Sequence, residues 1–154
     1  MVPGCYYEQL EWADIAVGDE LPEVTDHVSF TRIAAAPAAT LDYFPVHHDR
    51  EWAQASGLPD IVMSTLQIAG FVDRVVTQWA GSATFISRRK IRLATPVHPN
   101  DTIIGAGRVV AKRIDDEADG RHLVDVEVVV RNQRGDVCCP AELTINLTPA
   151  APPA

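Results

Sequence analysis

One carboxylate and one imidazole lie close together in the sequence, on either side of a proline. Asp42 and His47 are five positions apart, with Pro45 between them. The proline prevents the two side chains from sharing a helix face, because it interrupts a helix and favours an extended conformation at Phe44. A loop can instead bring both side chains to one point, and His48 could replace His47 if the loop adopts another register. Together the two groups could hold a water molecule, remove its proton and return a proton to a substrate, which is general acid–base catalysis.

Purely structural roles explain the same residues. Asp42 can cap a turn, His47 can be a buried histidine whose ring nitrogens are satisfied, and His48-Asp49 can open a helix. Spacing alone favours these common roles, because short motifs often occur without a function. The other histidines are expected at a strand start or on the surface: His27, His98 and His122.

The strongest secondary-structure signal lies directly after this cluster. From Ser64 to Ala80, apolar residues recur at spacings of three and four, which predicts one long helix that ends at Gly81. The apolar stripe is so broad that most of the helix surface must be covered. Its members are Leu66, Ile68, Ala69, Phe71, Val72, Val75, Val76, Trp79 and Ala80.

After Gly81 the apolar period changes to two, which predicts long strands. The expected strands cover 83–93, 102–113, 122–132 and 137–147, and the links at 114–121 and 133–136 contain Asp-Gly or Gly-Asp turn signals. One long buried helix followed by antiparallel strands is an α+β layout, in which a curved sheet wraps the helix.

Shorter elements are expected before the long helix. Residues 1–24 form an acidic, extended lead-in, and 27–33 alternate between apolar and polar residues, which predicts a strand. Pro37 limits 34–40 to one or two helical turns. Asp49 can cap a short helix over 50–56. The Pro/Ala-rich tail, 149–154, is expected to be flexible.

Composition narrows the possible partners. The chain has 154 residues, with 13 Lys+Arg against 21 Asp+Glu and a net charge of −8. This balance argues against nucleic acid and against an anionic membrane surface as partners. The cysteines are Cys5, Cys138 and Cys139, an odd number with two adjacent members, which indicates free thiols. No metal-ligand spacing, signal peptide or membrane span is recognisable, so a cytoplasmic location is expected.

Several motifs occur in an order that is typical of one family. They are Trp12-x-Asp14 with Val17-Gly18-Asp19, Asp42-x-Phe44-Pro45-Val46-His47, Gly57-x-Pro59, and Arg92-x-x-x-Pro96-Val97-x-Pro99-Asn100-Asp101-Thr102. Over almost its whole length the chain resembles the MaoC-like, or (R)-specific enoyl-CoA hydratase, family of hot-dog proteins. Phe44 stands where the family signature has Asn, and Ser64-Thr65 replaces the usual His-Gly pair. Asn100 replaces a glycine, which is a mild change because Asn tolerates a left-handed conformation.

The resemblance implies one hot-dog domain over 1–148 that hydrates a 2-enoyl-CoA thioester to the 3-hydroxyacyl-CoA. Asp42 and His47 would be the catalytic pair, or dyad. The backbone amides near Ser64 and Thr65 would stabilise the thioester oxygen. No cofactor is implied beyond the coenzyme A of the substrate. The strings at 46–50 and 75–81 are most similar to the dyad-bearing small subunit of actinobacterial heteromeric hydratases that act on steroid side chains.

In that subgroup a second MaoC-like subunit without the dyad completes the pocket, and a homodimer is the alternative assembly. Arg88, Lys90 and Arg92 share one strand face, where they could hold the phosphates of coenzyme A or simply form a solvated rim.

A hot-dog thioesterase is a second possible function. Asp73 lies in the middle of the helix rather than in its first turn, which disfavours hydrolysis. A third possible function is that of a non-catalytic partner subunit. The presence of both Asp42 and His47 argues against this role.

Overall fold

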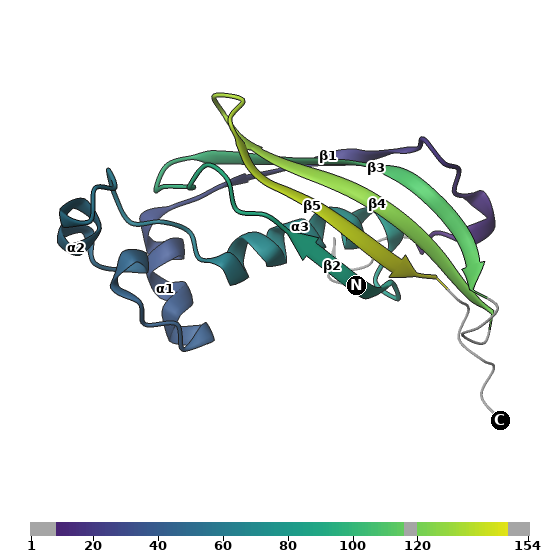
Figure 1. Ribbon diagram of the computed structural model, residues 1–154, viewed down its shortest axis with the longest axis horizontal. Helices are drawn as coiled ribbons and strands as arrows, with labels where there is room; N and C mark the ends of the chain where they lie inside the picture. Colours follow the sequence, from purple (N-terminus) through teal and green to yellow (C-terminus); the bar gives the residue numbers. More distant parts are fainter. Residues whose placement is uncertain (1–8, 116–119, 148–154) are drawn as a thin grey trace, which may run out of the picture.

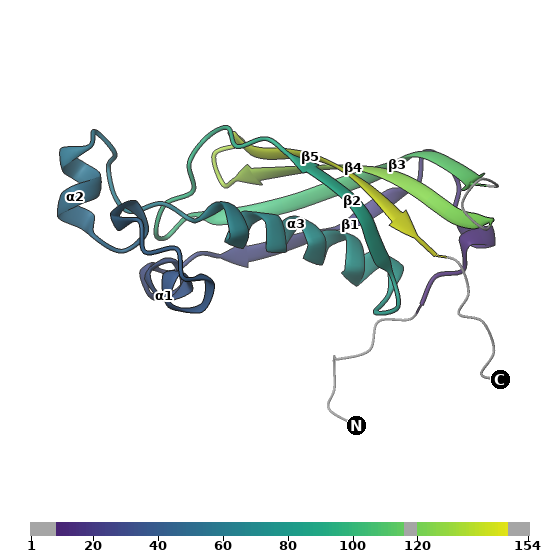
Figure 2. The same cartoon turned by 60° about the horizontal axis from the view of Figure 1, so that its bottom comes forward.

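A long helix, α3, lies along the concave side of a curved antiparallel sheet (Figures 1 and 2). The computed structural model describes residues 9–115 and 120–147. Their five strands have the order β1-β3-β4-β5-β2. The elements are η1 (Trp12–Asp14), β1 (Glu20–His27), α1 (Phe30–Thr40), η2 (Pro45–His47), α2 (Arg50–Ala55), α3 (Thr65–Ala80), β2 (Phe85–Ile91), β3 (Thr102–Asp115), β4 (Arg121–Asn132) and β5 (Val137–Asn146). This is the predicted α+β layout of a helix wrapped by a sheet.

The core lies between α3 and the inner face of the sheet. Phe71, Val72 and Val75 of the helix are almost completely buried. The alternating residues of β4 that face them are equally inaccessible: Val124, Val126, Val128 and Val130. The period-two pattern of the sequence therefore correctly identifies the inner face of this strand.

Glycine allows α3 to approach the sheet closely. A Cβ atom at Gly105 of β3 would lie 2.5 Å from Cγ2 of Val75 and 3.0 Å from Cε1 of Phe71. The ladders also contain irregularities, one of them between Val109 and Ala111 of β3 where it pairs with β4. Such bulges bend a strand and increase its twist, which helps the sheet to curve around the helix.

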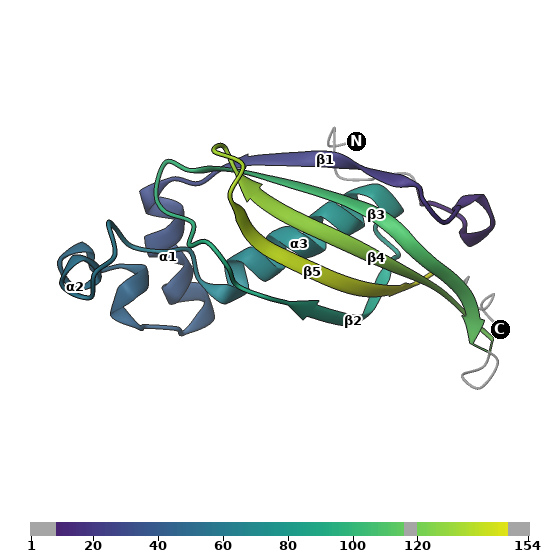
Figure 3. The same cartoon turned by 45° about the horizontal axis from the view of Figure 1, so that its top comes forward.

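The short helices α1 and α2 lie at one end of the molecule, beyond the N-terminal end of α3 (Figure 3). Asp49 caps α2 as predicted, since its side chain accepts a hydrogen bond from the amide of Trp52. Ser64 likewise caps α3, and Gly81 ends it with φ of 101°. Asn100 has φ of 69°, which confirms the left-handed conformation allowed by its replacement of glycine.

Two predictions between residues 27 and 40 are wrong. The strand runs from Glu20 to His27, so it begins inside the predicted lead-in and ends where the predicted strand starts. Residues 30–33 instead begin α1, because the Ser29 side chain accepts a hydrogen bond from the amide of Arg32 and so caps a helix. This helix has 11 residues although it contains Pro37, which is a buried residue. The predicted tail, 149–154, lies outside the described residues.

Cys138 and Cys139 are free, buried thiols, as the sequence predicts. Burial raises the pKa of both thiols, so both are protonated and unreactive near neutral pH. Cys5 lies outside the described residues. No helix among residues 9–115 and 120–147 is long and apolar enough to cross a membrane.

Candidate functional site

The loop between α1 and α2 brings Asp42 and His47 together. Leu41 ends α1 in a left-handed conformation, with φ of 57°, and so reverses the chain just before Asp42. Phe44 is extended, and Pro45 starts the single turn η2, which ends at His47. A proline at the first position of a turn has no amide to leave unsatisfied. The Nε2 atom of His47 consequently lies 3.5 Å from Oδ2 of Asp42.

A backbone carbonyl orients the imidazole. Nδ1 of His47 lies 2.8 Å from the carbonyl oxygen of Val62, and a carbonyl can only accept a hydrogen bond. Nδ1 therefore carries the proton in neutral His47, and the lone pair of Nε2 is directed toward Asp42. The amide of Val62 in turn donates to the carbonyl of Val46 at 3.0 Å. These two bonds attach η2 to the segment that leads into α3.

The two members of the pair differ in exposure. The His47 side chain is 11% exposed and that of Asp42 is 40% exposed. A separation of 3.5 Å is longer than an ordinary N–H···O hydrogen bond, so both groups can still bind a third molecule such as water. The neighbouring His48 is exposed, whereas His47 is buried. The geometry thus pairs Asp42 with His47 rather than with His48.

Aromatic rings line one side of the pair. Phe44, which replaces the Asn of the signature, lies edge-on to the His47 ring with the centroids 6.5 Å apart. Trp52 of α2 packs edge-on against Phe44 at 5.0 Å. Phe44 remains 54% exposed, so the site presents an apolar wall where a hydrogen-bonding side chain was expected.

Ser64 and Thr65 lie at the start of α3, two and three residues after Val62. Ser64 is buried, and its hydroxyl and amide are both used by a capping box with Gln67. Its amide is therefore not available to a substrate. Thr65 and Leu66 are exposed, and the first-turn amides of a helix have no partner within the helix. The amides at the exposed positions 65 and 66 are the donors that this helix end can offer.

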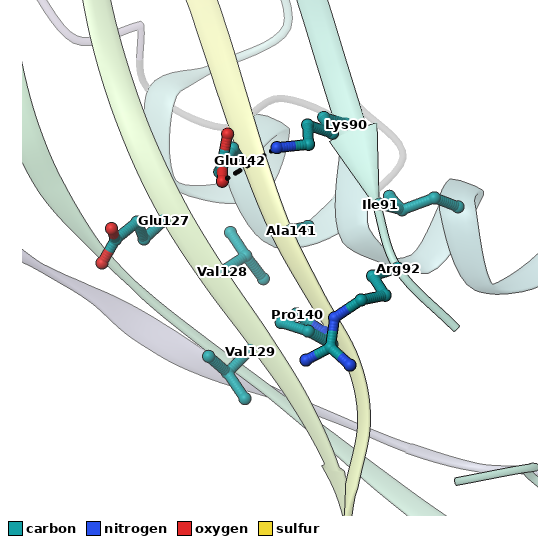
Figure 4. Close-up of a pocket in the computed structure, with 9 residues that line it drawn as sticks. All are labelled: Lys90, Ile91, Arg92, Glu127, Val128, Val129, Pro140, Ala141 and Glu142. Atoms are coloured by element: carbon teal, nitrogen blue, oxygen red, sulfur yellow. Dashed lines mark ion pairs between the residues drawn. The ribbon is translucent and has the colours of Figure 1, made fainter. Parts of the chain in front are cut away.

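Arg88, Lys90 and Arg92 lie away from the face that contacts α3. Their neighbour Arg89 forms an ion pair with Asp73 of α3, so the side chains before and after it point to the outer face. Figure 4 shows Lys90 and Arg92 at a shallow pocket of about 350 Å³ on this outer face, next to Pro140. Lys90 lies 3.5 Å from Glu142. The predicted cation set thus shares a face, and the chain by itself does not place it beside Asp42 and His47.

The environment of His98 differs from its prediction. His98, expected on the surface, is half-buried, and its Nδ1 lies 3.0 Å from the carbonyl oxygen of Ile61. Ile61 directly precedes Val62, the residue that orients His47. Nothing local in the sequence indicates this contact, because the two segments are 37 residues apart.

The site contains no arrangement of typical metal ligands. Within the part of the chain that the structure describes, no three His, Cys, Asp or Glu side chains are grouped so as to hold a metal ion. The groups that remain for chemistry are the Asp42 carboxylate, the His47 imidazole and the helix amides.

Comparison with known proteins relates this chain to one protein family. A family model described as a MaoC like domain matches residues 18–132. The 3-oxo-4,17-pregnadiene-20-carboxyl-CoA hydratase beta subunit of Mycobacterium tuberculosis is 40% identical over 120 residues, which cover 78% of this chain and 88% of that protein.

Solved structures agree with this likeness. A chain of the ChsH1–ChsH2 complex from Mycobacterium tuberculosis superimposes with a TM-score of 0.76 at 36% identity, over 85% of this chain and 97% of that chain. The R-hydratase PhaJ1 from Pseudomonas aeruginosa has a TM-score of 0.80 at 18% identity and covers 97% of both chains, which shows a shared fold.

Proposed function

The chain belongs to the MaoC-like family and has its hot-dog fold, and on that basis we propose that it is the dyad-bearing subunit of an enoyl-CoA hydratase. The reaction is the addition of water to a 2-enoyl-CoA thioester, which gives the 3-hydroxyacyl-CoA. One observation carries the proposal: a carboxylate and a correctly oriented imidazole lie 3.5 Å apart in a loop that is hydrogen-bonded to the segment before α3.

The proposed step uses both groups on one water molecule. Nε2 of His47 removes a proton from the water, whose oxygen forms a bond to the β-carbon of the thioester. The imidazolium that results is stabilised by the adjacent Asp42 carboxylate, and it returns the proton to the α-carbon. The product gains one hydroxyl and one hydrogen, so the atoms of water are fully accounted for and no cofactor is needed.

Negative charge develops on the thioester oxygen during this addition. The amides of Thr65 and Leu66 lie at the positive end of the α3 dipole and can donate to that oxygen. Ser64 contributes indirectly, since its capping box fixes the first turn of the helix.

The relatives support a proposal for the acyl group and for the partner. The beta subunit with 40% identity is named for a pregnadiene-carboxyl-CoA, and the matching structure is a complex of two proteins. The substrate we propose is therefore a steroid side-chain enoyl-CoA or a similarly bulky thioester.

A second MaoC-like subunit would complete the pocket, with a homodimer as the alternative. Arg88, Lys90 and Arg92 are proposed to bind the coenzyme A phosphates. The buried free thiols agree with a cytoplasmic location.

Hydrolysis of the thioester fits the structure less well. Asp73 is the only acidic residue of α3, and its carboxylate forms an ion pair with Arg89. A general base for hydrolysis would need a carboxylate that faces the substrate and is free to accept a proton from water.

The test is an activity measurement on the purified chain, alone and mixed with candidate MaoC-like partner subunits. Short, long and steroid-like 2-enoyl-CoA substrates are supplied, and the absorbance of the conjugated thioester is followed. We expect this absorbance to fall without release of free coenzyme A, most rapidly for a bulky acyl group with a partner present. Release of the free thiol at the rate of substrate loss would instead identify a thioesterase. No turnover with any substrate and partner would contradict the proposal.

A further inference from the structure

The three residues 61–63 lie just before α3 and are hydrogen-bonded to the loop that holds Asp42 and His47. Ile61 is completely buried and Met63 is 8% exposed. On one side, Val62 accepts the hydrogen bond from Nδ1 of His47. On the other, the amide of Met63 donates to the carbonyl of Val97 at 2.9 Å. The position of the His47 ring therefore depends on how this segment is held.

A second imidazole binds the same segment. Nδ1 of His98 lies 3.0 Å from the carbonyl oxygen of Ile61, and since that oxygen can only accept, His98 is the donor. Two adjacent carbonyls, those of Ile61 and Val62, are thus each held by a histidine ring. One ring belongs to the catalytic pair and the other belongs to the link between β2 and β3.

His98 is itself fixed by a buried charge. The amide of His98 donates to Oδ2 of Asp101 at 2.9 Å, and the Asp101 side chain is only 6% exposed. The other oxygen, Oδ1, accepts hydrogen bonds from Gln133 at 2.8 Å and Arg134 at 3.0 Å. The chain of contacts runs from the β4–β5 hairpin through Asp101 and His98 to the carbonyl next to the one that orients His47.

We infer that His98 is a positioning residue for the hydration reaction, which it supports by fixing the Ile61–Val62 segment that sets the tautomer and direction of His47. This inference rests on the function proposed above. A carbonyl that moves away from Nδ1 of His47 no longer determines which ring nitrogen carries the proton. Because small displacements of a catalytic group have large effects on rate, loss of the His98 donor lowers kcat by about tenfold to a hundredfold. KM changes little, since His98 is not placed in contact with the substrate.

Three substitutions separate the hydrogen bond from the packing of the ring. His98→Phe keeps a ring but has no donor. His98→Asn has a side-chain amide that can donate to Ile61, and His98→Leu is of similar size to Asn without a donor. We expect kcat to fall for Phe and Leu and to be largely retained for Asn. His27→Phe is the control, because His27 is exposed at the end of β1.

Two readouts are taken on the folded variants. One is kcat and KM for hydration with the partner and substrate that the wild-type protein requires. The other is the ¹⁵N NMR signature of the His47 ring, which reports its tautomer whether or not the protein is active. We expect the Nδ1-protonated form in the wild type and in His98→Asn, and a mixture of tautomers in His98→Phe and His98→Leu.

The outcomes are distinct. If His98→Leu has the kcat and the His47 signal of His98→Asn, or if His98→Phe matches the wild type in both, the inference is overturned. If the wild type shows no hydration at all, the proposed function fails instead, and the tautomer of His47 still decides whether His98 positions it. A loss of thermal stability with unchanged kcat and unchanged His47 signal would mean that His98 has only a structural role.

Discussion

At the scale of single residues, the loop that holds Asp42 and His47 begins with an unusual backbone conformation at Leu41. This residue has φ of 57°, although its side chain is not a glycine and is 74% exposed. A left-handed conformation costs a residue with a Cβ about 1–2 kcal/mol. The strain is located directly before Asp42, where the chain must reverse to bring the carboxylate to His47.

Replacement of Leu41 by glycine relieves this strain. The gain is partly offset by about 0.5–1 kcal/mol for the extra freedom of glycine in the unfolded chain, so Leu41→Gly should stabilise the protein by roughly 0.5–1 kcal/mol. Chemical denaturation measures the difference. Leu93→Gly is the control, because Leu93 is also exposed but does not have a positive φ. Equal destabilisation by both substitutions would show that the strain is absent.

The residues of the candidate site differ in how far the sequence predicts them. Asp42 and His47 carry a local motif, and the proline between them explains why they meet in a loop rather than on a helix. His98 carries no such motif, because its partner Ile61 is distant in sequence and accepts through a backbone atom that every residue has. The capping role of Ser64 is local, but its consequence, that the amide of Ser64 is already bonded, depends on the side chain of Gln67.

At the scale of elements, the contact between α3 and β3 sets how tightly the sheet wraps the helix. Gly105→Ala places a methyl group against Val75 and Phe71, and overpacking of this kind costs about 1–3 kcal/mol. Gly70→Ala is the matched control, because a Cβ there meets no atom within 4 Å and lies in the helix. Alanine in a helix interior is favoured over glycine by about 0.5–1 kcal/mol. The denaturant midpoint of unfolding should therefore fall for Gly105→Ala and rise for Gly70→Ala. A shift of the same sign for both variants would contradict this packing.

The hairpin between β4 and β5 is linked to the β2–β3 connection by a pH-dependent contact. Burial raises the pKa of Asp101, but hydrogen bonds from His98, Gln133 and Arg134 outweigh it and hold this pKa below its usual value. A carboxyl with a lowered pKa in the folded state stabilises the protein above its unfolded pKa, which is about 3.9. That contribution is lost as the pH falls through the folded pKa.

Asp101→Asn removes this contribution. We expect the variant to be less stable than the wild type at neutral pH, by about 1–3 kcal/mol, because hydrogen bonds to a charged group are lost. The gap between the free energies of unfolding of the wild type and the variant should remain constant down to about pH 4 and then close. Denaturation at a series of pH values measures it, and a gap that stays constant at lower pH would rule out the Asp101 contact as its cause.

The elements also show what sequence patterns can and cannot predict. The broad stripe of α3 and the alternation in β4 correctly predict the helix and the wrapped sheet, because long periodic segments average over local exceptions. The alternation at 27–33 is misleading, since it spans the boundary between β1 and α1. There the cap provided by Ser29 decides the structure, and the resulting helix accommodates Pro37.

At the scale of the whole molecule, the sheet has two edge strands, β1 and β2, within the described chain. An exposed edge is an available pairing surface. We expect the chain to pair with a second MaoC-like subunit or with a second copy. If it does, the midpoint of thermal unfolding should rise with protein concentration over about a hundredfold range, and further when the partner is added. A midpoint that is independent of both, with a monomer mass in solution, would contradict an assembly through these edges.

We propose that Asp42 and His47 act as one unit on one water molecule, and a double-mutant cycle on kcat distinguishes this from independent action of the two groups. Asp42→Asn, His47→Gln and the double variant are compared in the active assembly, with circular dichroism to show that each is folded. We predict that each single substitution lowers kcat by about 10²–10⁴-fold. The double variant should be little slower than the slower single one, because groups that act together are not additive. Either single variant hydrating the substrate at the wild-type rate would contradict the claim.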